Sequence, residues 1–421
     1  MLEILKSSWA LFLGLLLLML GNGLQGSLLG VRGAIEGFDA TTMAWVMSAY
    51  FIGFLIGSRM TPRMIARVGH VRVFAALGSM VSAAFILYPA APDPVVWSLM
   101  RLVVGFGFSG IYVVAESWLN AAATNENRGK TLSLYLLVQM TGIIAAQGLL
   151  NVADPGGYLL FVTMSVLVSV SFAPILLSVA PAPAFETTRP MGLMQLFEIS
   201  PLGVVGTFLL GSGFAAILGM SAVFGSLKGL SIAEISIFVG IIYVGGLLLQ
   251  YPVGYLSDRM DRRTLIVAIT VIGPIAILVL MPFTSHVAVL LLAGFVIGGV
   301  INPMYSLIIA HTNDYLDPSD MAAASGGLLY WHGLGAITSP LLLGFVMDSF
   351  GANSYFIYIA INLALIAVYG AYRMTRRVAP SLEEQGDFTT LTPQAMPLAA
   401  LAQYEEILEN EDDAPQELLG A

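Results

Sequence analysis

Arg101 is the most informative of a few charged residues that lie inside otherwise apolar stretches of the sequence. At about 100° per residue of α-helix, one helix face carries Arg101, Tyr112 and Glu116. A guanidinium inside a membrane helix is costly unless it meets water or a partner. Arg101 could therefore bind an anionic or carbonyl-bearing solute, couple to proton movement, or bond to backbone carbonyls of its own part of the fold.

Two further ionisable residues lie within apolar stretches. The carboxylate of Glu116 could pair with Arg67 or Arg72 as part of a gate, or it could carry a coupling proton. His332 follows Trp331, and imidazole titrates near neutral pH. Three interpretations stay open for His332: a buried histidine with satisfied hydrogen bonds, an aromatic pocket wall, or a proton relay.

Several uncharged polar or amphipathic side chains stand near the middle of the apolar stretches: Asn22, Gln25, Tyr112, Gln139, Tyr243, Asn302 and Tyr305. Each of them alone is explained by a hydrogen bond between helices. Together they predict a pocket with few charges and several aromatic rings. Such a pocket suits a neutral or weakly charged, partly apolar small molecule.

The elements that must position these residues are membrane helices. Hydrophobic residues make up 57% of the 421 residues, charged residues 10%, and mean hydropathy is +0.86. A membrane span needs about 20 apolar residues, and lipid offers the backbone no hydrogen-bond partner, so the spans must be helices. We predict twelve, near 8–31, 40–59, 72–91, 95–119, 129–151, 157–180, 200–226, 233–257, 263–282, 286–310, 321–346 and 354–373.

The two halves of the sequence resemble each other at an offset of 193 positions. The offset superposes Tyr50 on Tyr243, Gly105 on Gly298, Tyr112 on Tyr305 and Asn120 on Asn313. Paired six-helix halves around a central cavity are typical of secondary transporters that move by alternating access. We therefore predict bundles over 1–180 and 200–375, a linker with a short interfacial helix over 181–199, and an acidic, mostly disordered tail over 376–421.

The distribution of basic residues predicts the orientation. Fourteen Lys and Arg fall on one side of the predicted spans, against Arg32 and Lys228 on the other. Because cytoplasmic loops are the basic ones, both termini are expected in the cytoplasm of a bacterial cell, with the chain in the inner membrane. Residues 380–421 hold ten acidic residues and no Lys or Arg, which indicates a solvated tail or a partner-docking segment.

One loop motif occurs in each half. The second-half loop reads Gly254-Tyr-Leu-Ser-Asp258-Arg259-Met-Asp-Arg262-Arg263, and the first-half loop keeps Arg67, Gly69 and Arg72 but has Ala66 where an aspartate is expected. The predicted fourth span reads Arg101-Leu-Val-Val-Gly105-Phe-Gly107. With the twelve spans, these motifs resemble the major facilitator superfamily. The run Glu116-Ser-Trp118-Leu-Asn120 looks like its YcaD-like branch of bacterial permeases.

The resemblance implies a cytoplasmic gate at these loops. The carboxylate of Asp258 would accept backbone N–H groups from an opposing helix N-terminus, and neighbouring arginines would pair with acids across the seam. The gate residues would be Arg67, Gly69, Arg72, Gly254, Asp258, Arg259, Arg262 and Arg263. Alternatively, the arginines only anchor the orientation of the helices.

Other classes of protein find no support in the sequence. There is no Cys, no Gly-x-x-x-x-Gly-Lys-[Ser/Thr] loop, no Gly-x-Ser-x-Gly elbow and no zinc-ligand spacing among four His. We expect no enzyme, no metal, no cofactor and no nucleic-acid partner. The expected function is a monomeric permease that moves a small organic solute, with proton coupling implied by the resemblance. The alternative is a non-transporting sensor or assembly factor that acts through the tail.

The direction of transport stays open. The fifth span lacks the Gly-x-x-x-Gly-Pro pattern that exporters of the superfamily often carry, since it reads Gln139-Met-Thr-Gly142-Ile-Ile-Ala-Ala-Gln147-Gly148. The sequence therefore favours neither import nor export.

Overall fold

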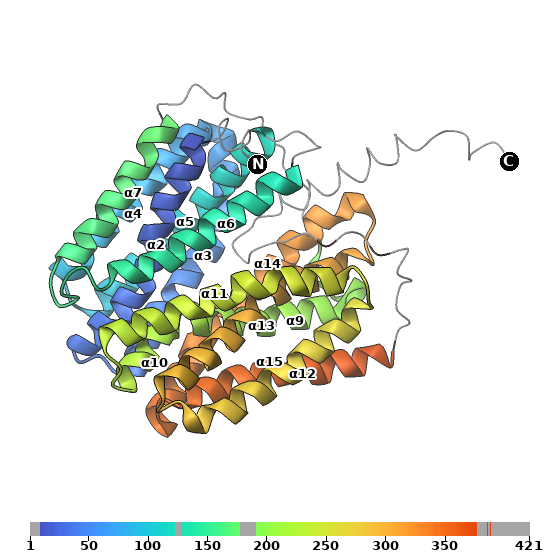
Figure 1. Cartoon of the computed structure of the whole chain (residues 1–421). Coiled ribbons are helices and arrows are strands. Elements are labelled where there is room, and N and C mark those ends of the chain that lie inside the picture. The colour runs from blue at the N-terminus through green and yellow to red at the C-terminus, as the bar shows by residue number, and fades with distance from the viewer. Residues whose placement is uncertain (1–8, 123–127, 177–190, 377–384, 386–387, 389–421) are drawn as a thin grey trace.

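Two bundles of apolar helices make up the fold of the computed structural model, which describes residues 9–122, 128–176, 191–376, 385 and 388 (Figure 1). The first bundle contains α2 (Trp9–Ile35), α3 (Ala40–Val68), α4 (His70–Ala90), α5 (Pro94–Ala122), α6 (Arg128–Leu149) and α7 (Leu159–Leu176). The second contains α9 (Pro201–Ala215), the π-helix η2 (Ala216–Met220), α10 (Ser221–Leu227), α11 (Ile232–Ser257), α12 (Arg262–Leu280), the 3-10 turn η3 (Met281–Phe283), α13 (Val287–Asn313), α14 (Pro318–Phe350) and α15 (Ser354–Met374).

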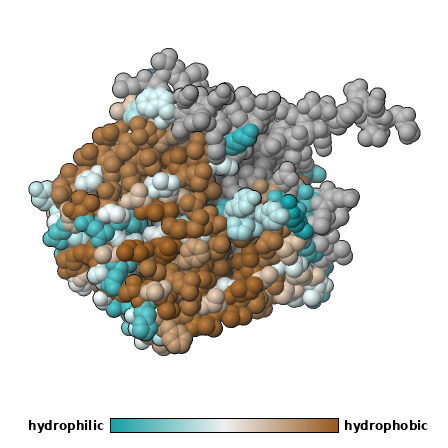
Figure 2. Space-filling view, in the orientation of Figure 1, coloured by the Kyte–Doolittle hydropathy of each residue, from teal (hydrophilic) through white to brown (hydrophobic). Residues whose placement is uncertain are grey.

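The predicted all-α membrane fold is confirmed. Eleven of the described helical segments are long and apolar enough to cross a membrane, where α9, η2 and α10 together form one. The predicted span 157–180 corresponds to the shorter apolar helix α7, and residues 177–180 lie outside the description. Figure 2 shows hydrophobic residues over most of the visible face of both bundles, as a lipid-facing surface requires.

The internal repeat appears as a repeated packing pattern. In the first bundle α2 packs on α6 and α7, and α3 on α5; in the second, α9 packs on α14 and α15, and α11 on α13. Between the bundles, α3 packs on α14, α6 on α11 and α2 on α10. The seam between the bundles is therefore formed mainly by α3 against α14, α6 against α11 and α2 against α10.

Paired glycines explain why the repeat shows in the sequence. A Cβ at Gly105 of α5 would overlap the carbonyl oxygen of Tyr50 on α3, and one at Gly298 of α13 would overlap that of Ile242 on α11. Glycine therefore lets the two backbones touch at equivalent places, which is the usual way to pack helices tightly in lipid.

Two segments connect to the predicted linker and tail. The amphipathic stretch before the second bundle forms α8 (Leu193–Ile199), with Leu196 buried and Met194 71% exposed. The predicted proline-rich part of the linker and most of the acidic tail, including a helix expected near 397–409, lie outside the described residues.

Candidate functional site

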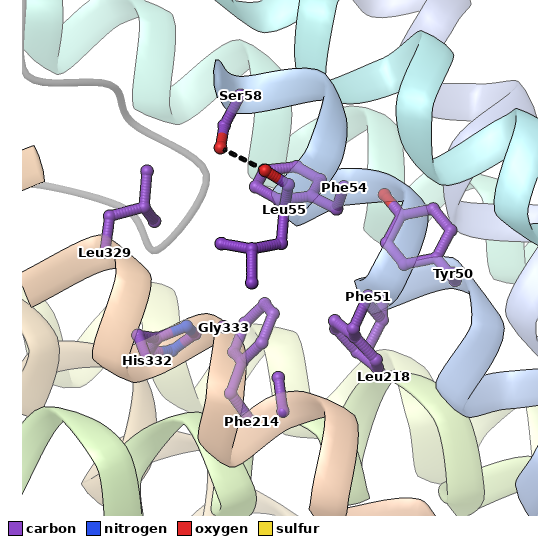
Figure 3. A pocket seen from close by; sticks show the side chains of 11 residues that line it. Tyr50, Phe51, Phe54, Leu55, Ser58, Phe214, Leu218, Leu329, His332 and Gly333 are labelled. Carbon is purple, nitrogen blue, oxygen red and sulfur yellow. Dashed lines mark hydrogen bonds between the residues drawn. The ribbon is translucent and has the colours of Figure 1, made fainter. Parts of the chain in front are cut away.

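A cavity lies between the two bundles and is built by both. Its volume is about 420 Å³, and its walls come from α3, the α9–η2 segment and α14. The lining residues are Tyr50, Phe51, Phe54, Leu55, Ser58, Phe214, Leu218, Leu329, His332, Gly333 and Ala336 (Figure 3). The wall is mainly aromatic and aliphatic, and the Ser58 hydroxyl already donates to the Leu55 carbonyl at 2.9 Å. Its wall offers aromatic and aliphatic contacts with few polar groups, as small-molecule sites usually do.

His332 is the residue lining this cavity that the sequence also singled out. The centroid of its ring lies 5.6 Å from that of Phe214 and 5.2 Å from that of Tyr305, the latter nearly perpendicular. Its Nε2 atom is buried and has no hydrogen-bond partner within the described part of the chain. The structure therefore places His332 in an aromatic wall with one ring nitrogen free for a ligand.

Three of the predicted polar residues meet in the first bundle. The Asn22 amide donates to the Tyr112 hydroxyl at 2.8 Å, and the Gln25 amide donates to Asn22 Oδ1 at 2.6 Å. The Gln25 Oε1 atom is buried without a partner among the described residues. These three hydrogen-bonded side chains do not line the cavity in the present conformation, so their contact with a solute stays a prediction.

Arg101 lies behind the cavity wall. Its side chain is 2% exposed, its Nη2 atom donates to the Met47 sulfur at 2.8 Å, and its guanidinium lies 5.0 Å from the ring centroid of Tyr50. Since Tyr50 lines the cavity, one aromatic ring separates Arg101 from it. Arg101 forms no ion pair with any residue that the structure describes, and its Nε atom has no partner there. Its contact with a solute stays a prediction.

The other predicted cavity residues surround this region. Tyr243, Gln139 and Asn302 are buried on α11, α6 and α13. Neither polar atom of the Gln139 amide has a hydrogen-bond partner in the described part of the chain, whereas the Asn302 amide donates to the Gly298 carbonyl at 3.0 Å. Trp331 packs against the core beside His332, and its Nε1 lacks a partner among the described residues.

Glu116 accepts a hydrogen bond from a residue of its own bundle. It is 3% exposed, and its Oε1 atom accepts a hydrogen bond from the Tyr135 hydroxyl at 3.0 Å. The predicted pairing with Arg67 or Arg72 is not present, because both arginines are exposed and form no ion pair with a described residue. Beside them, Gly69 ends α3 and precedes α4 at φ +84°, a backbone conformation that requires glycine.

The second-half gate motif differs from the expected arrangement in its partners. Asp258 Oδ1 accepts a backbone N–H at 2.9 Å, but the donor is Phe388 of the C-terminal segment and not an opposing helix. Arg262 pairs with Asp314, and Arg263 with Asp261 at 3.2 Å, so both pairs stay inside the second bundle. Pairing across the seam would need a different conformation, because in this one the arginines are already neutralised locally.

Two other members of that motif face the protein surface and the C-terminal segment. Arg259 donates to the Tyr255 carbonyl at 3.1 Å and stacks over its ring at 3.6 Å. A Cβ at Gly254 would lie 2.8 Å from a ring carbon of Phe388, so this glycine makes room for the aromatic ring.

Contacts at the opposite end, which is predicted to face outside, join the two bundles. The Asp348 carboxylate on α14 accepts the N–H groups of Ala40 and Thr41 at 3.1 and 2.8 Å, and the Thr41 hydroxyl at 2.6 Å. The Ser48 hydroxyl donates to the Ile337 carbonyl at 2.6 Å. Nothing local in the sequence indicated Asp348, because its partners lie about 307 positions away. These bonds join the two bundles at this end.

Models of transporter families match both halves of the chain. The model described as "Major Facilitator Superfamily" matches residues 203–404, and the model described as "Sugar (and other) transporter" matches residues 24–185. Each match covers one of the bundles described above.

Relatives and solved structures agree with these matches. The chain is 26% identical over 354 residues to the uncharacterized MFS-type transporter YcaD of Escherichia fergusonii, covering 82% of this chain and 90% of the relative. It is 25% identical over 357 residues to YcaD of Salmonella heidelberg, covering 83% and 91%. In fold it is similar to the nucleoside transporter NupG (TM-score 0.73, 14% identity, 90% and 100% coverage) and to a D-xylose-proton symporter (TM-score 0.66, 14% identity, 90% and 99% coverage).

Proposed function

Because the chain belongs to the major facilitator superfamily and is a multi-pass transporter and not an enzyme, we propose that it moves a small, partly apolar organic solute by alternating access at the cavity between its bundles. The observation that carries this proposal is the cavity itself. It has walls from both bundles, and its lining offers few polar atoms. A solute bound there would contact both moving parts at once.

The chemistry of the wall supports a solute of low polarity. Aromatic rings from Phe51, Phe54 and Phe214 supply apolar contact, while His332 Nε2 is a polar atom without a partner among the described residues that could orient a ligand. The structural neighbours are a nucleoside transporter and a D-xylose-proton symporter. A solute with many hydroxyl groups would leave most of them unsatisfied here, at a cost of about 1–3 kcal/mol for each buried group. We therefore propose a neutral or weakly charged solute with an aromatic or aliphatic body.

The same helices supply the means of alternating access. α3 carries the outer contacts with Asp348 and also five residues of the cavity wall. A rotation that breaks the outer contacts must therefore move one wall of the cavity. Met47, which accepts a hydrogen bond from Arg101, lies on the same helix. We propose that this motion uncovers Arg101 toward the solute path, where a carbonyl or anionic group could meet it.

Proton coupling is the third part of the proposal. His332 has a free, buried ring nitrogen beside the cavity, and Glu116 is a buried acid in the first bundle. Exclusion of water disfavours the charged form of either group, and entry of water favours it. Either group can therefore bind or release a proton when water enters or leaves the site. We place the chain in the bacterial inner membrane with both termini in the cytoplasm. A proton gradient across that membrane is available to drive such coupling.

The test is a thermal-shift screen of purified protein against metabolites and drug-like solutes at two pH values. Ser58→Leu narrows the cavity, and Thr338→Leu is the matched control, since Thr338 is exposed on α14 and does not line the cavity. We expect an apolar solute to stabilise the wild type and Thr338→Leu but not Ser58→Leu. Equal stabilisation of all three would place the solute elsewhere. A response to polyhydroxylated solutes alone would refute the proposed polarity.

Transport distinguishes a permease from a sensor. A permease should keep solute exchange in proteoliposomes after removal of residues 380–421 and lose it in Ser58→Leu. A sensor that acts through its tail should show no exchange in either form.

A further inference from the structure

A second cavity, separate from the one between the bundles, lies at the end of the second bundle that is predicted to face the cytoplasm. Its volume is about 280 Å³. The walls come from the junction of α8 and α9, the first turn of α12, the end of α13 and the last turn of α15. The lining residues are Ile199, Ser200, Pro201, Leu202, Arg263, His311, Tyr315 and Arg373. Segments far apart in the sequence thus place two arginines, an imidazole and a phenol around one hollow.

The two arginines differ in how their charge is balanced. Arg263 is buried and pairs with Asp261 at 3.2 Å. Arg373 is half-buried and forms no hydrogen bond or ion pair with any residue that the structure describes. Among the described residues, one positive charge of the cavity wall is therefore left without a counter-charge. A half-buried guanidinium in this state gains from a bound anion, because it has already lost part of its hydration.

The backbone adds positive potential at the same place. The fifteen-residue helix α9 and the nineteen-residue helix α12 both begin at the cavity. Helix N-termini carry a partial positive charge. The Ser200 hydroxyl accepts the Gly203 N–H at 3.2 Å, and Asp261 accepts the Arg263 N–H at 2.9 Å. The N–H of Leu202 belongs to the first turn and has no partner inside its helix.

The wall also offers neutral groups that suit an oxyanion. The His311 and Tyr315 rings meet nearly perpendicularly, with centroids 5.2 Å apart. Imidazole N–H and phenol O–H groups donate to phosphate oxygens, and guanidinium groups bind them with paired hydrogen bonds. The cavity borders α8, which exposes Met194 and Phe197 where the membrane surface is expected. A ligand here could therefore have an anionic head in the cavity and an apolar chain along α8.

We propose that this cavity binds one phosphate group, carried either by an anionic phospholipid headgroup or by a free phosphate from the cytoplasm. The bound group would join α9, α12 and α15 through the start of α9, Arg263 and Arg373. It would therefore tie the cytoplasmic end of the second bundle together without occupying the cavity between the bundles. The proposal does not depend on what the central cavity transports.

The experiment measures the thermal stability of the full chain, purified in a neutral detergent, during titration with phosphatidylglycerol, phosphatidylcholine or inorganic phosphate. We expect phosphatidylglycerol to raise the melting temperature in a saturable way and phosphatidylcholine to have little effect. Arg373→Gln should weaken the apparent affinity about tenfold, as expected for losing one charged hydrogen-bonding partner. Arg373→Lys should restore part of it.

The matched control is Arg376→Gln. Arg376 lies just beyond the same helix end, is exposed, and stacks over Tyr372 at 5.2 Å without lining the cavity. Equal losses in Arg373→Gln and Arg376→Gln would show general surface attraction and overturn the site. The absence of any response to both phosphatidylglycerol and phosphate would overturn it as well. A response of the wild type to phosphate alone, lost in Arg373→Gln, would support the site and assign the ligand to the cytoplasm.

Discussion

The outer contact at Asp348 makes a quantitative prediction about the conformational equilibrium. All three of its hydrogen-bond donors belong to Ala40 and Thr41, at the start of α3 in the other bundle. The carboxylate thus caps a helix N-terminus across the seam, and opening the outer end must break every one of these bonds. Asp348→Asn keeps the shape of the side chain but removes its charge and one of its two acceptor oxygens.

The magnitude follows from the kind of bond and its exposure. Hydrogen bonds to a charged group contribute about 1.5–3 kcal/mol when they are shielded from water. Asp348 is exposed, so the sum for the contact is discounted to about 1–2 kcal/mol. At 1.4 kcal/mol for each factor of ten, the substitution should raise the ratio of outer-open to outer-closed protein about 5- to 30-fold.

Cysteine labelling can measure this ratio, because the chain contains no Cys. Ala44 on α3 is fully buried and faces Gly344 at the seam, so Ala44→Cys reports opening. The rate of labelling by a membrane-impermeant maleimide added outside should rise by the same factor in Asp348→Asn. Asp93→Asn is the control, since Asp93 accepts N–H groups of Val95 and Val96 within a single bundle. An unchanged rate in Asp348→Asn, or an equal rise in both variants, would refute the reasoning.

Three further predictions concern the ends and the packing of the helices. Gly254→Cys combined with Phe388→Cys should form a disulfide on mild oxidation, because the two positions touch; no cross-link would exclude the contact. Hydrogen bonds to the Asp39 carboxylate lower its pKa below the usual 3.8, so its contribution to stability is present above pH 3.8 and lost as the pH falls below it. Asp39→Asn should then show a shallower loss of melting temperature in acid, and an unchanged slope would contradict this. Gly105→Ala should destabilise the protein by about 2–3 kcal/mol through backbone overlap, whereas Gly148→Ala, which meets open space, should not.

Much of the fold follows from the sequence, because the physical rules that govern it are local. A run of apolar residues must become a helix in lipid wherever it lies, so the spans could be read directly. The pair Gly105 and Gly298 could also be recognised in the sequence as a repeat. The structure explains the pair, because close helix packing leaves no room for a side chain at either position. Even Tyr50, which lines the cavity, was visible as a repeat position, although nothing local distinguished its cavity role from a packing role.

The composition of the site could be predicted less well. The sequence selected buried polar residues, and the structure brings Asn22, Gln25 and Tyr112 together as expected of such residues. The cavity itself is lined mostly by apolar residues, which look the same in sequence whether they face a solute, a neighbouring helix or lipid. His332 could be found because a histidine in an apolar span is rare for energetic reasons.

Hydrogen-bond partners across the seam between the bundles could not be predicted from the sequence. Asp348 looks like any acid near a helix end, and only the packing of α14 against α3 brings it to Thr41. In the same way, only the packed structure shows that Arg262 pairs with Asp314 as well as with Asp258, and that Asp258 accepts the N–H of Phe388. The sequence by itself determined which segments enter the membrane, their helical form and their repetition, because each depends on residues close in the chain. The tertiary structure alone decided which polar groups meet and where the two bundles are joined, because hydrogen bonds between distant segments exist only once the helices have packed.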